Sequence, residues 1–119
     1  MKVAFSVSGN DLSALLDMRF GRCAGFLVLD TETNAFEVVP NQQNAQAAQG
    51  AGIQAAECVL NTGADVLVSG HCGPKAFKVL QAGGVRIFNA ESRPVADLVE
   101  AWKRGELVEA KAADVEGHW

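Results

Sequence analysis

The sequence predicts one α/β domain with a three-layer architecture and a mixed sheet. Two observations carry this prediction. Short apolar runs rich in β-branched residues alternate with helical patterns, and two of these runs are separated only by a short polar turn. Strands separated by helices become parallel neighbours in a sheet that is covered on both faces. A chain of 119 residues, 49% of them hydrophobic and 20% charged, is the size of one domain and can form a packed core.

Five strands and three long helices are expected. The polar turn at 31–35 joins two strands as a hairpin. Pro74 stands at the first position of a helix and Gly83 follows its end, which is the usual asymmetry of helix termini. In chain order the expected elements are strands at 3–7, 26–29 and 36–39, a helix at 44–61, a strand at 66–68, a helix at 74–82, a strand at 85–88 and a helix at 95–104. Residues 1–107 would form the domain and residues 108–119 an acidic C-terminal tail.

Charge and hydropathy exclude several classes of protein. The net charge of −4 disfavours a dedicated nucleic-acid binder, which would show a basic excess. No apolar run approaches the ~20 residues that a membrane span needs, and the first residues read as a strand rather than as a signal peptide. We therefore expect a cytoplasmic protein with neither a membrane nor a nucleic acid as partner.

Three cysteines, Cys23, Cys58 and Cys72, indicate reduced thiols, because the count is odd and no C-x-x-C pair is present. Four thiolates for an iron–sulfur cluster cannot come from this chain alone. Cys58 falls on the apolar face of a predicted helix, so a buried role is expected. Cys23 and Cys72 fall in loops, so they are expected to be accessible thiols.

The turn after the fourth strand is the most informative segment. It reads Gly70-His71-Cys72-Gly73 and leads into the helix that contains Lys75. The first turn of a helix offers backbone N–H donors and a positive dipole end, so it attracts anions. Ligands also bind beyond the carboxyl ends of parallel strands. The plain alternative is a strand-to-helix turn whose glycines serve geometry only.

The loop after the first strand, Ser8-Gly9-Asn10, would face that turn if the first and fourth strands are neighbours. Its alternative role is structural, because Asn10 or Asp11 could cap a helix at 12–18.

A third segment places Arg19 and Arg22 beside Cys23. Two arginines would bind an anion well and would lower the pKa of the neighbouring thiol. The alternative is a pair of surface arginines bound to Asp11 or Asp17.

Catalytic signatures are missing from the sequence. The first strand contains no carboxylate, and neither a G-x-S-x-G elbow nor a phosphate-binding P-loop motif is present. This pattern favours a binding protein over an enzyme. Two alternatives remain. One is a small-molecule or nucleotide-binding enzyme whose site lies in the crevice between the same loops, and the other is a partner-interaction module. A Cys72–His71 nucleophile pair would be the most plausible enzyme site.

An ordered set of short motifs runs along nearly the whole chain, and it resembles the dinitrogenase iron–molybdenum cofactor biosynthesis family, the NifX/NifB-type domains. The resemblance covers about residues 1–107. The motifs are the strand Met1 to Val7, Arg19-Phe20-Gly21-Arg22, Asn41 followed by Gly50-Ala51-Gly52, Gly63-Ala64-Asp65-Val66 leading to Gly70-x-x-Gly73, Leu80-x-x-Gly83-Gly84, and Trp102-x-x-Gly105-Glu106-Leu107.

The resemblance implies a ribonuclease-H-like fold with a mixed five-stranded sheet, and non-enzymatic carriage of a metal–sulfur cluster or its precursor. Stand-alone members occur in anaerobes without a nitrogenase role, and one holds a molybdenum–copper sulfide cluster largely without covalent protein ligands. This chain looks like such a member, with a molybdenum–copper sulfide or iron–molybdenum–sulfur cluster as its cargo. The partners implied are this cluster and a cluster-assembly or ATPase-type protein, and the chain would be a monomer or weak dimer.

A thiometallate cluster is a large, soft anion, which suits the cationic loops. The expected cluster-binding residues are Ser8, Gly9, Asn10, Arg19, Arg22, Cys23, Gly70, His71, Cys72, Gly73 and Lys75. If the metal is directly ligated, His71 and Cys72 would be its ligands, since imidazole and thiolate suit copper or iron. Met18, Phe20 and Phe77 would cover the apolar face of the cluster.

Overall fold

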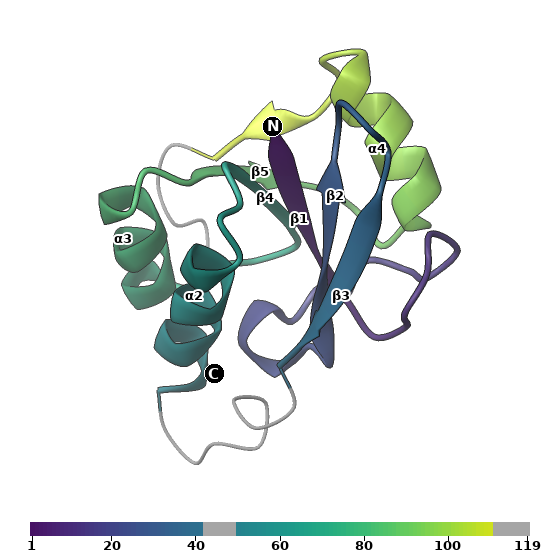
Figure 1. Cartoon of the computed structure of the whole chain (residues 1–119). Helices are drawn as coiled ribbons and strands as arrows, with labels where there is room; N and C mark the ends of the chain where they lie inside the picture. Colours follow the sequence, from purple (N-terminus) through teal and green to yellow (C-terminus); the bar gives the residue numbers. More distant parts are fainter. Residues whose placement is uncertain (42–49, 111–119) are drawn as a thin grey trace.

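The computed structural model describes residues 1–41 and 50–110. Figure 1 shows a sheet with helices on both faces. Strands and helices occur where the alternation of apolar runs predicts them. Only residues 51–61 of the helix expected at 44–61 can be compared, because residues 42–49 lie outside the described part. The elements are β1 (Lys2–Val7), the 3₁₀ turn η1 (Phe20–Arg22), β2 (Gly25–Asp30), β3 (Phe36–Pro40), α2 (Ala51–Asn61), β4 (Val66–Ser69), α3 (Pro74–Ala82), β5 (Arg86–Asn89), α4 (Val95–Lys103) and β6 (Val108–Glu109).

The sheet is mixed and its strands follow the order β3-β2-β1-β4-β5-β6. β1, β4 and β5 run parallel at the centre, where Phe5 pairs with Val68 and Val68 pairs with Phe88. The predicted hairpin of β2 and β3 adds the antiparallel side. The neighbouring position of β1 and β4 matters most for function, because it brings the loops that follow these two strands to the same edge of the sheet.

The sheet has six strands, so the expectation of five is wrong. The additional strand, β6, falls in residues that were expected to belong to the tail. It pairs antiparallel with β5, and Glu109 binds the Arg86 guanidinium at 2.8 Å. A strand of two residues is too short to show a hydrophobic period, so only its partner strand and this ion pair define it. The other tail residues, 111–119, lie outside the described part of the chain.

Two apolar layers confirm the three-layer architecture. Alternate residues of the central strands point to opposite faces, so Ala4 belongs to one layer and Phe5 to the other. Leu80 of α3 and Val59 of α2 pack on the face of Ala4, and Leu98 of α4 packs on the face of Phe5. Figure 1 shows α2 and α3 together on one side of the sheet and α4 on the other. No helix within the described ranges is long and apolar enough to cross a membrane.

The helix considered at 12–18 does not form. Asp11 accepts hydrogen bonds from the Ser13 backbone N–H at 2.9 Å and from the Ser13 hydroxyl, so its side chain closes a local turn instead of capping a helix. Short polar side chains compete with helical hydrogen bonds in this way. Leu16, which is buried, then forms a β-bridge with Val7 and extends the chain across the end of β1. The loop that leads to Arg19 is therefore attached to the sheet.

Candidate functional site

The loops that follow β1 and β4 meet at one edge of the sheet. The backbone N–H of His71 donates to the carbonyl oxygen of Met18 at 3.3 Å, and Arg19 and His71 form a parallel β-bridge. The sequence predicted that the loops after the first and fourth strands would face each other, and the β1–β4 pairing confirms the neighbouring strands on which that expectation rested. We call this region the strand-end site and define it by Ser8, Asp17, Met18, Arg19, Gly70 and His71.

Gly70 lets the two loops approach closely. A Cβ atom at this position would lie 2.7 Å from the Met18 Cα and 2.8 Å from the Met18 Sδ, which real Cβ atoms essentially never do. Gly70 is itself buried. Gly70 therefore serves the geometry of the turn, as the plain alternative held, because the group that approaches it is Met18 of the neighbouring loop.

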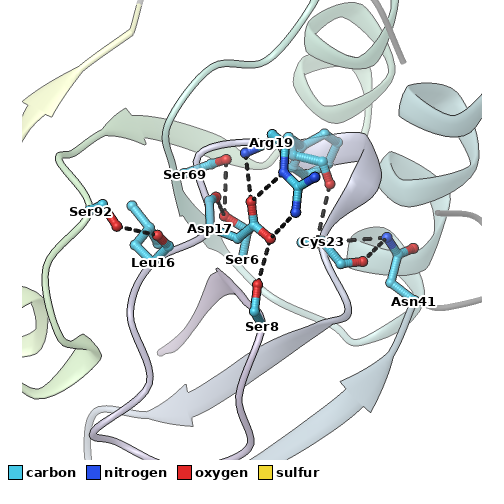
Figure 2. Close-up of polar contacts among 10 residues, drawn as sticks. Ser6, Ser8, Leu16, Asp17, Arg19, Cys23, Asn41, Ser69 and Ser92 are labelled. Carbon is cyan, nitrogen blue, oxygen red and sulfur yellow. Dashed lines mark hydrogen bonds and ion pairs between the residues drawn. The ribbon is translucent and has the colours of Figure 1, made fainter.

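Two buried serines fasten the Asp17 segment to the central strands (Figure 2). The Ser6 hydroxyl donates to the Asp17 carbonyl oxygen at 2.8 Å, and the Asp17 N–H donates to the Ser6 carbonyl oxygen at 2.7 Å. The Ser6 and Ser69 hydroxyl oxygens lie 3.2 Å apart, which links β1 to β4. Because Ser6 and Ser69 are fully buried, each hydroxyl needs such a partner.

The Asp17 carboxylate is the centre of the polar network drawn in Figure 2. Its Oδ2 accepts from the Ser8 hydroxyl at 2.6 Å and from Arg19 Nη2 at 3.3 Å. Its Oδ1 accepts from the Arg19 backbone N–H at 2.9 Å and from Arg19 Nε at 3.3 Å. Burial alone would raise the pKa of Asp17, but the hydrogen bonds from Ser8 and Arg19 outweigh it and hold that pKa below its ordinary value. Asp17 is therefore ionised at neutral pH.

Arg19 is thus bound to Asp17, as the structural alternative proposed. This pairing does not remove Arg19 from the surface, because its side chain is 67% exposed whereas that of Asp17 is 6% exposed. The guanidinium lies side-on to the carboxylate through Nε and Nη2, so its Nη1–Nη2 edge is directed away from Asp17. Arg22 is half-buried at the end of η1.

Cys23 is not the activated thiol that the sequence suggested. Its side chain is fully buried beneath η1, where its Sγ donates to the Phe20 carbonyl oxygen at 3.2 Å. Burial, reinforced by the negative charge of Asp17, raises the pKa of Cys23 to about 12. The lowered pKa predicted from the nearby arginines is therefore wrong, because desolvation dominates. Asn41, also buried, donates from Nδ2 to the Cys23 carbonyl oxygen at 3.0 Å and holds this segment in place.

The accessibility expected for the three thiols is also reversed. Cys72, predicted to be accessible, is only 3% exposed, whereas Cys58, predicted to be buried, is half-buried and borders a surface cavity of about 500 Å³. Cys58 lies on α2 beside the edge strand β3, with its Sγ 3.9 Å from the Pro40 carbonyl oxygen, and a helical period does not reveal how deeply a residue is buried at the edge of a sheet.

Thiol labelling of the native protein should therefore modify Cys58 first. Iodoacetamide followed by peptide mass mapping will give the order, with Cys23 and Cys72 modified only after denaturation. Equal labelling of all three thiols in the native protein would contradict the burial described above.

The remaining predicted site residues are distributed around the strand-end site. His71 and Lys75 are exposed, and Lys75 lies in the first turn of α3, whereas Gly73 is buried at the N-cap of that helix with an ordinary φ of −65°. The structure places Gly9 and Asn10 in the exposed turn after β1. Phe20 and Phe77 are buried in the core, so of the three residues expected to cover an apolar ligand only Met18 lies partly at the surface.

The supporting residues of the site, Ser6, Ser69 and Asp17, were not predicted from the sequence. Ser6 and Ser69 stand inside or at the end of apolar strand segments, and a hydroxyl in such a position is a signal that a buried partner exists. From the sequence, Asp17 is expected to be a surface partner for an arginine or a loop carboxylate that shares no centre with other acids.

Comparison with known proteins identifies the family. The sequence model of the dinitrogenase iron–molybdenum cofactor family matches residues 1–105. The chain belongs to this family.

Two solved structures and one further protein sequence agree with this membership. The apo form of the orange protein from Desulfovibrio gigas is 37% identical, with 96% of each chain covered and a TM-score of 0.93. A candidate NifB protein from Thermotoga is 32% identical, with 98% of each chain covered and a TM-score of 0.84. An uncharacterised protein from Methanocaldococcus jannaschii is 26% identical over 90% of this chain and 89% of its own length. The likeness to these relatives therefore extends over nearly the whole domain rather than over one motif.

Proposed function

We propose that this protein binds a metal–sulfur cluster, or a precursor of one, as cargo at the strand-end site and carries it without catalysing a reaction. Family membership and the orange protein neighbour support a role related to a metal cofactor. The observation that supports this location is the parallel β-bridge between Arg19 and His71, which joins the backbones of a residue with a cationic side chain and a residue with an imidazole beyond the carboxyl ends of β1 and β4.

The side chains available at the site favour binding of the cluster by electrostatic attraction. Cys23, with a pKa of about 12, is a poor thiolate donor at neutral pH. Within residues 1–41 and 50–110, no group of three or more His, Cys, Asp or Glu side chains is arranged to hold a metal ion. Arg19, Lys75 and His71 are exposed and suit an anionic, sulfur-rich cluster of the molybdenum–copper or iron–molybdenum type.

His71 is the residue we assign as a direct metal ligand if one is used, because its imidazole is exposed. Cys72 becomes a ligand only if the turn opens, since it is buried. We further propose that the protein has a ribonuclease-H-like fold and acts as a monomer or weak dimer. It would release its cargo to a cluster-assembly or ATPase-type protein.

Anaerobic reconstitution tests this function directly. Purified apo-protein is mixed with tetrathiomolybdate, with and without Cu(I), and is then separated from small molecules by gel filtration. Visible charge-transfer absorption that co-elutes with the protein, together with molybdenum by elemental analysis, is the expected result. Colourless, metal-free protein under both conditions would refute the proposal. A heat-denatured sample controls for nonspecific adsorption.

A further inference from the structure

Asp17 has a role in the strand-end site that a simple surface ion pair would not explain. We propose that Asp17 is a positioning residue, which holds the Arg19 guanidinium side-on so that its Nη1–Nη2 edge is presented to an anion. This inference rests on the proposed function, since it names how the anion at that same site is received.

The contacts of Asp17 constrain both the residue and its partner. Ser6 binds the Asp17 backbone from both directions, at 2.8 and 2.7 Å, so the residue cannot shift along β1. Ser8 fixes Oδ2 at 2.6 Å, and the Arg19 backbone N–H fixes Oδ1 at 2.9 Å. Each carboxylate oxygen is thus oriented before the guanidinium binds to it. Figure 2 shows the Arg19 side chain folded back over this carboxylate.

The exposed position of the Arg19 side chain determines how much conformational entropy anion binding would cost. An exposed arginine side chain is usually mobile, and ordering it on binding an anion costs conformational entropy. Here the side chain is 67% exposed but is held by Nε and Nη2, each 3.3 Å from a carboxylate oxygen. The Nη1–Nη2 edge matches two neighbouring atoms of a tetrahedral thiometallate or oxyanion in a forked contact. Asp17 therefore lowers the ordering cost of anion binding.

A charge-only account predicts the opposite behaviour. Asp17 is negatively charged and belongs to the site, so its repulsion alone would weaken the binding of an anion. Removing that charge should then tighten binding. Because positioning and repulsion predict changes of opposite sign, a substitution that removes the charge while keeping the shape separates them.

The test is the affinity of Asp17→Asn for tetrathiomolybdate, measured by anaerobic titration of the visible absorption. We expect binding to weaken about tenfold, because the asparagine amide no longer accepts from the guanidinium through both of its former oxygens and the Arg19 side chain becomes mobile. Asp11→Asn is the matched control. Asp11 lies on the same loop and binds Ser13, so the variant removes the same charge while leaving Arg19 in place. Its affinity should stay within about twofold of the original protein.

A double-substitution comparison shows whether Asp17 acts through Arg19. In the Arg19→Ala background, Asp17→Asn should cause no further weakening. Equal weakening in both backgrounds would overturn the inference and assign Asp17 a merely structural role. Unchanged or tighter binding by Asp17→Asn alone would overturn it as well. If the original protein itself binds no tetrathiomolybdate, the proposed function fails instead.

A nuclear magnetic resonance measurement tests the positioning without any ligand. The Arg19 Nε–H, donated to Asp17, should give a resolved signal that is protected from solvent exchange, and this signal should be lost in Asp17→Asn. The same signal in both proteins would overturn the inference whatever the binding data show. If Asp17→Asn does not fold, Ser8→Ala replaces it, because it removes only the contact to Oδ2. Ser8→Ala should speed the exchange of the Arg19 Nε–H, and an unchanged exchange rate would overturn the inference.

Discussion

Replacing Arg19 and Arg22 together by alanine is expected to weaken the binding of tetrathiomolybdate by about a hundredfold. Arg19 binds Asp17 through Nε and Nη2, so its Nη1–Nη2 edge is directed away from Asp17, and Arg22 lies one turn further along η1. Both would make charge-assisted hydrogen bonds to an anionic cluster, and such bonds are the strongest that these loops can offer. Anaerobic titration followed by visible absorption measures the change.

The matched control for this variant is Lys103→Ala with Arg104→Ala, which removes the same number of positive charges from the end of α4. These two residues are exposed and bind Asn34 and Glu106, away from the strand-end site. The control should bind tetrathiomolybdate as the original protein does. Equal weakening by the two double variants would mean that only the net charge matters, and it would contradict the site proposed here.

Gly70→Ala is expected to have the second large effect, because it separates the two loops of the site. The added Cβ would lie 2.7 Å from the Met18 Cα, so the Met18 backbone, and not only a flexible side chain, must move. Overpacking of this kind costs about 1–3 kcal/mol of folding free energy. The bond between the His71 N–H and the Met18 carbonyl oxygen would be lost with it, and anion binding should fall at the same time. Urea denaturation and tetrathiomolybdate titration measure the two effects.

Gly63→Ala provides the comparison for Gly70→Ala. Gly63 has a φ of +77°, and an added Cβ there would have no atom within 4 Å, so alanine is strained but meets nothing. It should cost about 1–2 kcal/mol of stability and leave tetrathiomolybdate binding unchanged. If Gly70→Ala also leaves binding unchanged, the close approach of the two loops is not what forms the site.

Local patterns predicted most of the fold, because most of its elements are defined by residues close in sequence. The apolar run at 66–68, the proline at position 74 and the glycines that follow 82 each mark an element or its end. β6 could not be predicted in this way, since two residues have no period and their partner lies on β5. The helix considered at 12–18 does not form, for a related reason. Asp11 is as suitable for a turn as for a helix cap, and the burial of Leu16 against the sheet decides between them.

The meeting of the loops that follow β1 and β4 was predictable, but the electrostatics of their residues were not. Arg19 and His71 meet because they follow parallel neighbouring strands, and the order of strands and helices contains that information. The state of Cys23 depends on how deeply η1 covers it, and sequence neighbours do not show depth. The arginines nearby suggested a reactive thiolate, whereas desolvation leaves a protonated thiol. Asp17 was underestimated for the same reason, since its importance comes from Ser6, Ser8 and the backbone geometry around them.

Under the proposed function, the attachment of Asp17 to Ser6 would affect the rates at which cargo is bound and released. The two hydrogen bonds join the loop that contains Asp17 and Arg19 to β1. β1 is a central strand, and central strands are among the last parts of a domain to unfold. The loop therefore needs no folding step before it receives an anion, so capture can proceed at the rate of diffusional encounter. Dissociation of the anion is not accelerated in the same way, because a rigid loop does not open spontaneously. Under the proposed function, the rate of cargo release would then depend on the contacts that a recipient protein offers, and we expect direct transfer from one protein to another rather than release into solution.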